Sequence, residues 1–184
     1  MTEALSPVHL VPGLILVVAW KSSEDTGEGV TWGVLAAGLA MAVPIAYLRR
    51  ELRAGRISDH NVRVRSQRPR VLLVTTASIL TTLGVVAAGD APRDLVALVS
   101  AQAVGLVLFG IITRWWKISF HAGGTAGTVT TLVLVFGPRL LLLTPLVPLA
   151  AWSRVTLGDH TPCQVSVGAA LGGVVAWVVF SWIR

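Results

Sequence analysis

Long runs of apolar residues separated by short polar loops constrain this chain more than any other feature of its sequence. Hydrophobic residues make up 54% of its 184 residues, and charged residues only 13%. A helix needs about 20 mostly apolar residues to cross roughly 30 Å of hydrocarbon. Seven runs approach or reach that length, at about 8–20, 29–48, 71–88, 94–113, 118–136, 140–152 and 164–183. The sequence therefore predicts an all-α fold, an integral membrane helical bundle of six or seven transmembrane segments.

The number of crossings depends on the shortest runs. The run at about 8–20 is short enough to be a re-entrant or interfacial piece, and the run at about 140–152 contains Pro145 and Pro148. The loops between runs are brief, so we expect one transmembrane domain over residues 1–184 with no linker. The N-terminus lacks the charged region and cleavage site of a secretory signal, so the first run is expected to stay in the protein.

Three polar stretches, 49–70, 114–121 and 153–163, are predicted to lie on one membrane face whether the chain crosses six or seven times. Eleven of the 15 Lys and Arg residues fall in them, at 49, 50, 53, 56, 63, 65, 68, 70, 114, 117 and 154. Excess positive charge marks cytoplasmic loops, which predicts a cell-membrane protein with this face in the cytoplasm. Because the net charge of +6 is spread between apolar segments, it indicates orientation and phosphate attraction, with no nucleic-acid partner.

These stretches contain three short motifs at fixed spacing, namely Asn61-x6-Arg68-Pro69, Ser119-Phe120-His121 and Ser153-Arg154-x5-His160-x3-Gln164. From about residue 49 to residue 180, the chain resembles the type 2 phosphatidic acid phosphatase superfamily of lipid phosphatases. The signatures of that superfamily read K-x6-R-P, P-S-G-H and S-R-x5-H-x3-D. The third motif is the most specific, because its Ser, Arg and His all stand at the expected spacing.

The resemblance implies a metal-independent phosphatase that uses no cofactor. In that mechanism His160 attacks phosphorus and forms a phosphohistidine, His121 protonates the leaving oxygen and then activates water, and Gln164 orients His160. The implied phosphate-binding positions are Arg68, Ser119, Arg154, Asn61 and Lys117. The chemistry suits these residue types, because phosphoryl transfer needs positioning and positive charge around the phosphoryl oxygens, and a histidine nucleophile must keep one ring nitrogen free.

The chain departs from the superfamily pattern at four positions. Asn61 stands where the family has lysine, and Arg63, Arg65 or Lys117 could supply the missing charge. Ile118 and Phe120 replace the proline and glycine of the second motif. Gln164 replaces aspartate, so its carbonyl can accept the His160 N–H but brings no negative charge. We expect a slower enzyme or a different pH optimum from these changes.

Each of these residues also has a structural interpretation. Thr161-x-x-Gln164 is the pattern of a helix capping box. His121 could be a packing histidine and His160 a solvated loop histidine. Arg154 follows the end of a run, where arginines often extend to the membrane surface. Six glycines, at 123, 124, 127, 168, 172 and 173, are typical of close helix packing in lipid.

Two other functions, metal binding and prenyl transfer, would require residue patterns that can be sought in the sequence. Asp59 with His60, and Asp159 with His160, could suggest a metal site, but no metal-binding spacing such as H-E-x-x-H is present and no metal is expected. A membrane prenyltransferase would need aspartate-rich pairs to hold magnesium, and the chain has only nine acidic residues and no such pairs.

The partners expected are membrane lipids and a lipid phosphate substrate. That substrate is of the isoprenoid, polyprenyl or phosphatidate type. The alternative is a non-catalytic or transport protein that binds a phosphorylated lipid without cleaving it, which Asn61 and Gln164 favour.

Overall fold

The computed structural model describes residues 7–60, 62 and 64–184, and all regular secondary structure in that part of the chain is helical. The elements are α1 (Pro7–Ser22), α2 (Thr26–Arg53), the 3-10 helix η1 (Arg65–Gln67), α3 (Arg68–Ala88), α4 (Arg93–Thr113), α5 (Phe120–Phe136), the 3-10 helix η2 (Pro138–Leu143), α6 (Leu146–Thr156) and α7 (Pro162–Ile183). The predicted all-α bundle is therefore confirmed.

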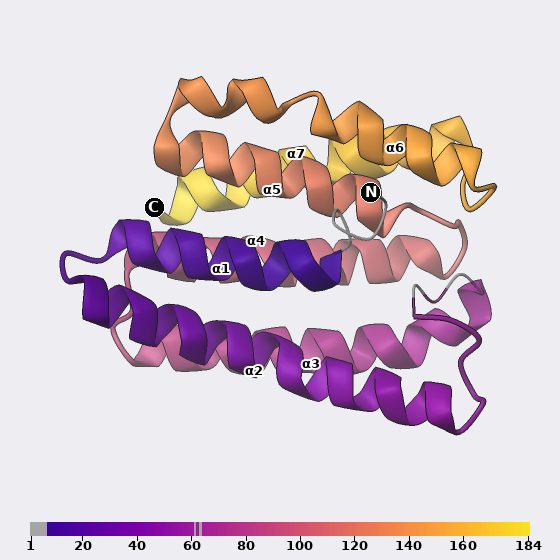
Figure 1. The fold of residues 1–184 in the computed structure, drawn as a ribbon, viewed down its shortest axis with the longest axis horizontal. Coiled ribbons are helices and arrows are strands. Elements are labelled where there is room, and N and C mark those ends of the chain that lie inside the picture. The colour runs from indigo at the N-terminus through magenta and orange to yellow at the C-terminus, as the bar shows by residue number, and fades with distance from the viewer. Residues whose placement is uncertain (1–6, 61, 63) are drawn as a thin grey trace.

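The helices run roughly along one axis and reverse direction at short connections (Figure 1). Helix α4 contacts α1, α3, α5 and α7, and its buried residues include Leu95, Leu98 and Phe109. The packing of these helices around α4 buries a core of small and branched side chains. The outward faces of the helices remain apolar and exposed.

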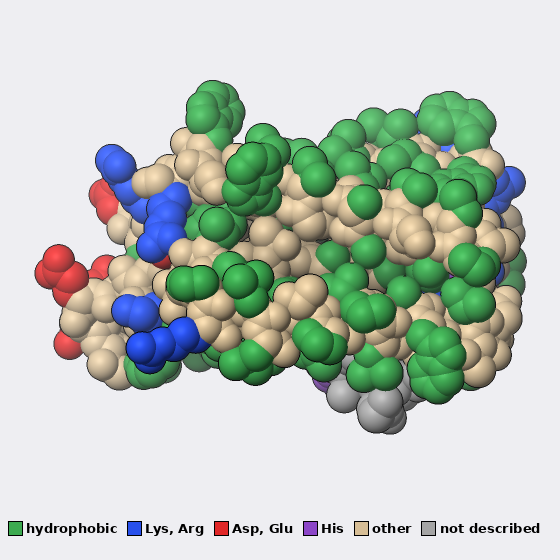
Figure 2. Space-filling model, turned by 90° about the horizontal axis from the view of Figure 1, so that it is seen from above, with side chains coloured by type: hydrophobic (Ala, Val, Ile, Leu, Met, Phe, Trp, Pro, Cys, Tyr) green, Lys and Arg blue, Asp and Glu red, His purple; other side chains and the backbone are tan. Residues whose placement is uncertain are grey.

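This exposed apolar surface is more extensive than expected for a protein surrounded by water. Leu73 exposes 73% of its surface and Trp182 87%, and Figure 2 shows hydrophobic side chains along the flank of the molecule, with acidic side chains gathered at one end. Large exposed apolar areas on a helical bundle are expected where the surrounding medium is lipid. The chain is therefore compatible with an integral membrane protein.

Four helical segments are long and apolar enough to cross a membrane, at Thr26–Arg53, Arg65–Ala88, Arg93–Thr113 and Pro162–Ile183. Two shorter apolar helical stretches, Val8–Ser22 and Phe120–Phe136, accompany them. The run predicted at about 140–152 is divided, because η2 ends at Leu143 and α6 begins at Leu146. Six or seven crossings therefore stay a prediction.

Glycines bring α5 and α7 into direct backbone contact. A Cβ added to Gly172 would collide with the carbonyl group of Gly123, and one added to Gly168 would lie 2.7 Å from the carbonyl oxygen of Ser119. Only a residue without a side chain allows this approach. The contact holds the start of α5, next to the second motif, against the start of α7, which carries Gln164, the last residue of the third motif.

Candidate functional site

The three motif-bearing stretches lie at the same end of the bundle (Figure 1). The Nη1 group of Arg68 donates to the carbonyl oxygen of Ile118 at 3.3 Å, and the backbone N–H of Ser119 donates to the carbonyl oxygen of Gln164 at 3.4 Å. Hydrogen bonds thus join the start of α3 to the α4–α5 loop, and that loop to the start of α7. The motifs form one cluster, although about 100 residues separate the first from the last.

The end of α6 positions His160. Gly158 adopts a φ of +69°, which a residue with a side chain rarely adopts, and this turns the chain back after the helix. The backbone N–H groups of Asp159 and His160 then donate to the carbonyl oxygen of Arg154, at 3.0 and 3.2 Å. As a result His160 lies over the last turn of α6, beside Arg154, and is only 9% exposed.

Two acceptors hold one ring nitrogen of His160. Its Nδ1 lies 3.1 Å from the carbonyl oxygen of Lys117 and 3.2 Å from Oε1 of Gln164. Since both partners only accept, the neutral ring must carry its hydrogen on Nδ1, and Nε2 keeps a lone pair. Burial lowers the pKa of His160, and the nearby charge of Arg68 lowers it further. The ring is therefore neutral at neutral pH, in the tautomer that a nucleophile requires.

Gln164 performs both of the jobs that its position allowed. Thr161 is the N-cap of α7, and its hydroxyl accepts the Gln164 backbone N–H at 3.3 Å. Gln164 Oε1 accepts the Thr161 backbone N–H at 3.2 Å, and also the His160 Nδ1–H. The capping box thus fixes the glutamine side chain, and the glutamine in turn fixes the imidazole.

Arg154 is buried rather than extended to the membrane surface. Its side chain is 3% exposed, so the interpretation of this arginine as an interfacial anchor is wrong. Its Nε donates to Oγ of Ser153 at 3.4 Å, and its Nη1 pairs with Oδ2 of Asp159 at 3.4 Å. The cation therefore lies inside the cluster, held by long contacts within its own motif.

Arg68 is held almost entirely by backbone carbonyls. It is 7% exposed, and its Nε donates to the carbonyl oxygen of Val62 at 3.0 Å, in addition to the Ile118 bond. Its guanidinium carbon lies 5.7 Å from the centroid of the Phe120 ring, within cation–π range. Carbonyls and a ring face orient the guanidinium, and the negative charges of Asp159 and Asp59 also act on it. A guanidinium fixed in this way can present a fork of donors to an anion.

Ser119 and Lys117 lie between these groups. Ser119 is fully buried as the N-cap of α5, where its Oγ accepts the Ala122 N–H at 3.3 Å. Lys117 is half-buried, and it touches His160 through its carbonyl oxygen, a role its side chain could not reveal. The positive charge of Lys117 also lowers the pKa of His160, so this cation acts on the site as well.

His121 is the second residue of α5 and is half-buried. The predicted phosphate-binding position Asn61 lies outside the described residues, as does Arg63. Within the described part of the chain, no three His, Cys, Asp or Glu side chains are placed to hold a metal ion.

Sequence reasoning missed two contributors to the cluster. Asp159 pairs with Arg154, and the carbonyl of Lys117 shares the His160 hydrogen with Gln164. The position of Asp159, directly before His160 and five residues after Arg154, was the available signal for the first.

No family model, curated protein or solved structure matches this chain.

Proposed function

We propose that this chain is an integral membrane phosphatase that hydrolyses a lipid phosphate or diphosphate, of the type 2 phosphatidic acid phosphatase kind. The observation that carries the proposal is the state of His160. Its Nδ1–H is directed at two acceptors, its Nε2 keeps a lone pair, and the positive charges of Arg68 and Lys117 act on the ring. The carbonyl oxygen of the buried Arg154 accepts the His160 backbone N–H. A neutral, oriented imidazole among cations is suited to attack phosphorus.

The reaction would proceed in two displacements. Nε2 of His160 attacks phosphorus, the bond from phosphorus to the lipid oxygen breaks, and His121 gives its proton to the departing alkoxide. Water then attacks the phosphohistidine, His121 takes the proton from that water, and inorganic phosphate leaves as the N–P bond breaks. Since the imidazole starts neutral, the attack first gives an imidazolium-like ring, whose Nδ1–H the Lys117 carbonyl and Gln164 hold.

Charge around the phosphoryl oxygens would come from Arg68, Arg154 and Lys117, with the Ser119 hydroxyl as a further donor. Carbonyl groups fix the fork of Arg68, which is buried at the start of α3, although the charges of Asp159 and Asp59 also act on it. A second source of positive potential is the start of α5, where the positive end of the helix dipole favours an anion. Together these groups stabilise a transition state that gains charge on the transferred group.

The same proposal extends to topology. We propose that α1 and α5 also enter the bilayer, which gives six crossings, or seven when the η2–α6 region crosses as well. We propose further that the protein lies in the cell membrane and that its motif end faces the cytoplasm. Eleven of the 15 Lys and Arg residues at that end support this orientation. Cysteine labelling of an Arg53→Cys variant from each side of intact cells tests it, and labelling from outside would reverse the orientation.

One observation favours the alternative, a protein that binds a phosphorylated lipid without cleaving it. Asp159 pairs with Arg154 at 3.4 Å, so a phosphate must compete with a carboxylate for that guanidinium. Gln164 adds no negative charge to support an imidazolium. Such a protein would bind lipid phosphates but would never carry a covalent phosphate.

The experiment that separates the two readings follows phosphate. Purified protein is given isoprenoid monophosphates, isoprenoid diphosphates and phosphatidate, with and without a chelator, and both released phosphate and acid-labile protein-bound phosphate are measured. His160→Asn keeps a side-chain N–H that can reach Gln164 but removes the nucleophile, and His9→Ala removes an exposed histidine on α1. Release and labelling lost only in His160→Asn would support the phosphatase. Binding without either would favour the alternative.

A further inference from the structure

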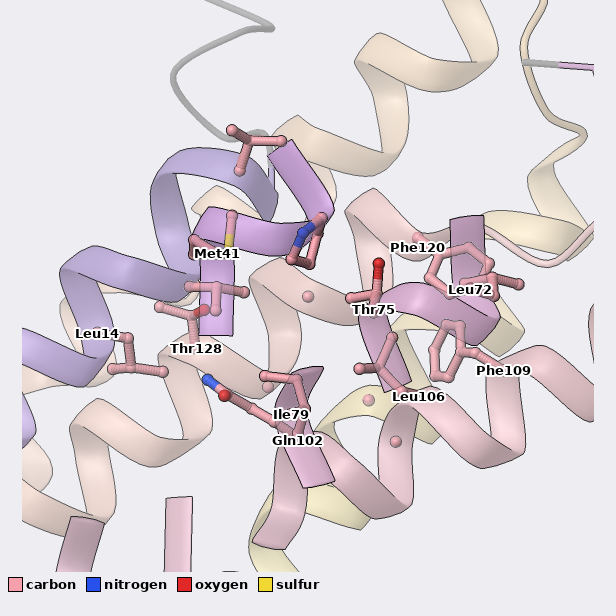
Figure 3. A pocket seen from close by; sticks show the side chains of 18 of the residues that line it. Leu14, Met41, Leu72, Thr75, Ile79, Gln102, Leu106, Phe109, Phe120 and Thr128 are labelled. Atoms are coloured by element: carbon pink, nitrogen blue, oxygen red, sulfur yellow. The ribbon is translucent and has the colours of Figure 1, made fainter. Parts of the chain in front are cut away.

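An apolar cavity of about 310 Å³ lies between α1, α2, α3, α4, α5 and α7. Leu14, Ile79, Leu106 and Phe109 are among the side chains that point into it (Figure 3). Side chains of this kind hold apolar groups, and cavities between bundle helices are common ligand sites. The cavity is distinct from the polar cluster but lies within the same bundle.

One end of the cavity shares its wall with the cluster. Phe120 and Val62 both line the cavity. The guanidinium of Arg68 lies over the Phe120 ring, and its Nε is bonded to the Val62 carbonyl oxygen. A ligand with its apolar part in the cavity would therefore place an attached group beside the buried cations. The complementary molecule is an amphiphile with an anionic head and an apolar tail.

The dimensions of the cavity limit that tail. Its α4 wall runs from Leu98 to Phe109, which at 1.5 Å per residue is ~16 Å. Its volume is about twice that of a cavity known to take one benzene ring, so roughly a dozen carbons fit. Both measures describe a single chain of about 10–15 carbons and leave no room for two.

We propose that this cavity binds the hydrocarbon chain of a single-chain lipid phosphate, with about 10–15 carbons lying against the protein. The proposal rests on the proposed function for the identity of the head group, and it narrows the substrate class. Isoprenyl phosphates of two or three units fit it, whereas the second chain of phosphatidate would have to remain in the bilayer.

Two glycines of α4 provide the test. Gly105 lines the cavity, and a Cβ there would meet only Val175 Cγ1, at 4.0 Å, so a longer side chain can enter without a backbone clash. Gly110 lies five residues along the same helix, has nothing within 4 Å of its Cβ position and is absent from the cavity wall. Gly105→Leu therefore fills the cavity, and Gly110→Leu is its matched control.

The probes are butyl and dodecyl phosphonate, whose P–C bond cannot be hydrolysed, titrated calorimetrically against detergent-purified protein. We expect Gly105→Leu to weaken dodecyl phosphonate binding by about tenfold, the usual scale of overfilling a packed site, with butyl phosphonate unchanged and Gly110→Leu without effect on either. Comparing variants with one ligand cancels the partition of each chain into micelles. The milder Gly105→Ala gives a smaller loss in the same direction and guards against misfolding.

The outcomes separate this proposal from the phosphatase itself. Equal dodecyl affinity in the wild type and Gly105→Leu, alongside normal phosphate release, would remove the cavity proposal and leave the enzyme; this is also the result if bulk bilayer lipid fills the cavity. Loss of dodecyl binding in Gly105→Leu alone, from a protein that releases no phosphate, would keep the chain site and remove the enzyme. A wild type that binds neither phosphonate overturns the cavity proposal.

Discussion

The two ends of the bundle both carry an ion pair, but they bury it to different degrees. At the end opposite the motifs, Arg184 Nε lies 3.1 Å from Asp94 Oδ1, with the two side chains 44% and 13% exposed. The Arg184 Nη1 also donates to the Leu134 carbonyl oxygen at 2.6 Å, and Ser22 Oγ donates to Asp94 Oδ2. These contacts connect α1, α4, α5 and α7, and the side chain of Arg184 remains partly exposed.

The motif end carries the ion pairs Arg56–Glu51, whose arginine side chain is 49% exposed, and Arg154–Asp159, which is almost fully buried. Arg154 and Asp159 are 3% and 10% exposed, and Arg68 and His160 are buried beside them. Burying a cation costs desolvation free energy, which an exposed ion pair avoids. An ion pair that only joins two helices therefore does not need to be buried. The exposed pair at the opposite end therefore serves to join helices, and we propose that the buried cations of the motif end bind an anion.

The largest effect should come from His160, the proposed nucleophile. We expect His160→Asn to reduce kcat/KM for the preferred lipid phosphate by about 10³-fold or more, because the proposed covalent intermediate forms on this side chain. His9→Ala, which changes an exposed histidine, should leave it unaltered. Phosphate-release kinetics on both variants check this. Comparable losses in the two would contradict the assignment of the nucleophile to His160.

The two arginines allow a direct comparison of the ends. Arg154→Lys keeps the charge but loses the planar fork, so we expect kcat to fall by about 10²-fold, as when one transition-state donor is removed. Arg184→Lys makes the same change at the exposed pair and should cost less than about twofold, because surface ion pairs contribute little. A kcat loss in Arg184→Lys equal to that in Arg154→Lys would contradict the assignment of chemistry to one end.

The pH dependence sharpens the role of Gln164. Burial and the charge of Arg68 lower the pKa of His160. In the proposed mechanism the neutral ring is the attacking form. Activity should therefore persist as the pH falls through 6.5, the usual pKa of histidine. It should decline only at lower pH, where the lowered pKa of His160 is reached. Gln164→Glu places a negative charge on the Nδ1–H, stabilises the imidazolium and should move this acidic limb up by about one pH unit.

Gln67 supplies the control for that shift. Its Oε1 accepts hydrogen bonds from the backbone N–H and the hydroxyl of Ser58 in an exposed loop. Gln67→Glu adds the same charge and should leave the acidic limb of kcat/KM in place. An unchanged limb in Gln164→Glu would indicate that the Lys117 carbonyl alone orients the ring.

Much of the fold could be predicted from the sequence because apolar run length reports bilayer crossing directly. Helices α3, α4 and α7 begin and end within a few residues of the predicted runs. The run at about 140–152 was harder, since Pro145 lies between η2 and α6, and Gly137, with a φ of +93°, separates α5 from η2 before it. Prolines in a run show that it is irregular but not where it breaks.

The site was predictable only as far as side chains carry it. The motif spacing pointed to Arg154, His160 and Gln164 as one group, and hydrogen bonds or backbone contacts now link them. The carbonyls of Val62, Lys117 and Ile118 complete the cluster. Carbonyl oxygens are the same in every residue, so no sequence pattern reveals where they will be used.

The smallest expected effect concerns two buried oxygens on α4. Among the described residues, Gln102 Oε1 and Thr113 Oγ1 are buried without a hydrogen-bond partner. Gln102 lines the cavity (Figure 3), and Thr113 ends the helix at the motif end. An unpaired buried polar atom costs about 1–3 kcal/mol, so Gln102→Leu should raise the melting temperature by ~2–4 °C.

Thr113→Val tests the same physics at the other position. Its melting temperature should also rise, because valine keeps the shape of threonine and removes only the orphaned hydroxyl. Thermal unfolding in detergent, with phosphate release measured in parallel, distinguishes two cases. If both variants become more stable and keep their activity, the oxygens are packing defects. If Thr113→Val alone gains stability but loses activity, the hydroxyl serves the cluster, and the polar site extends from the loops into the end of α4.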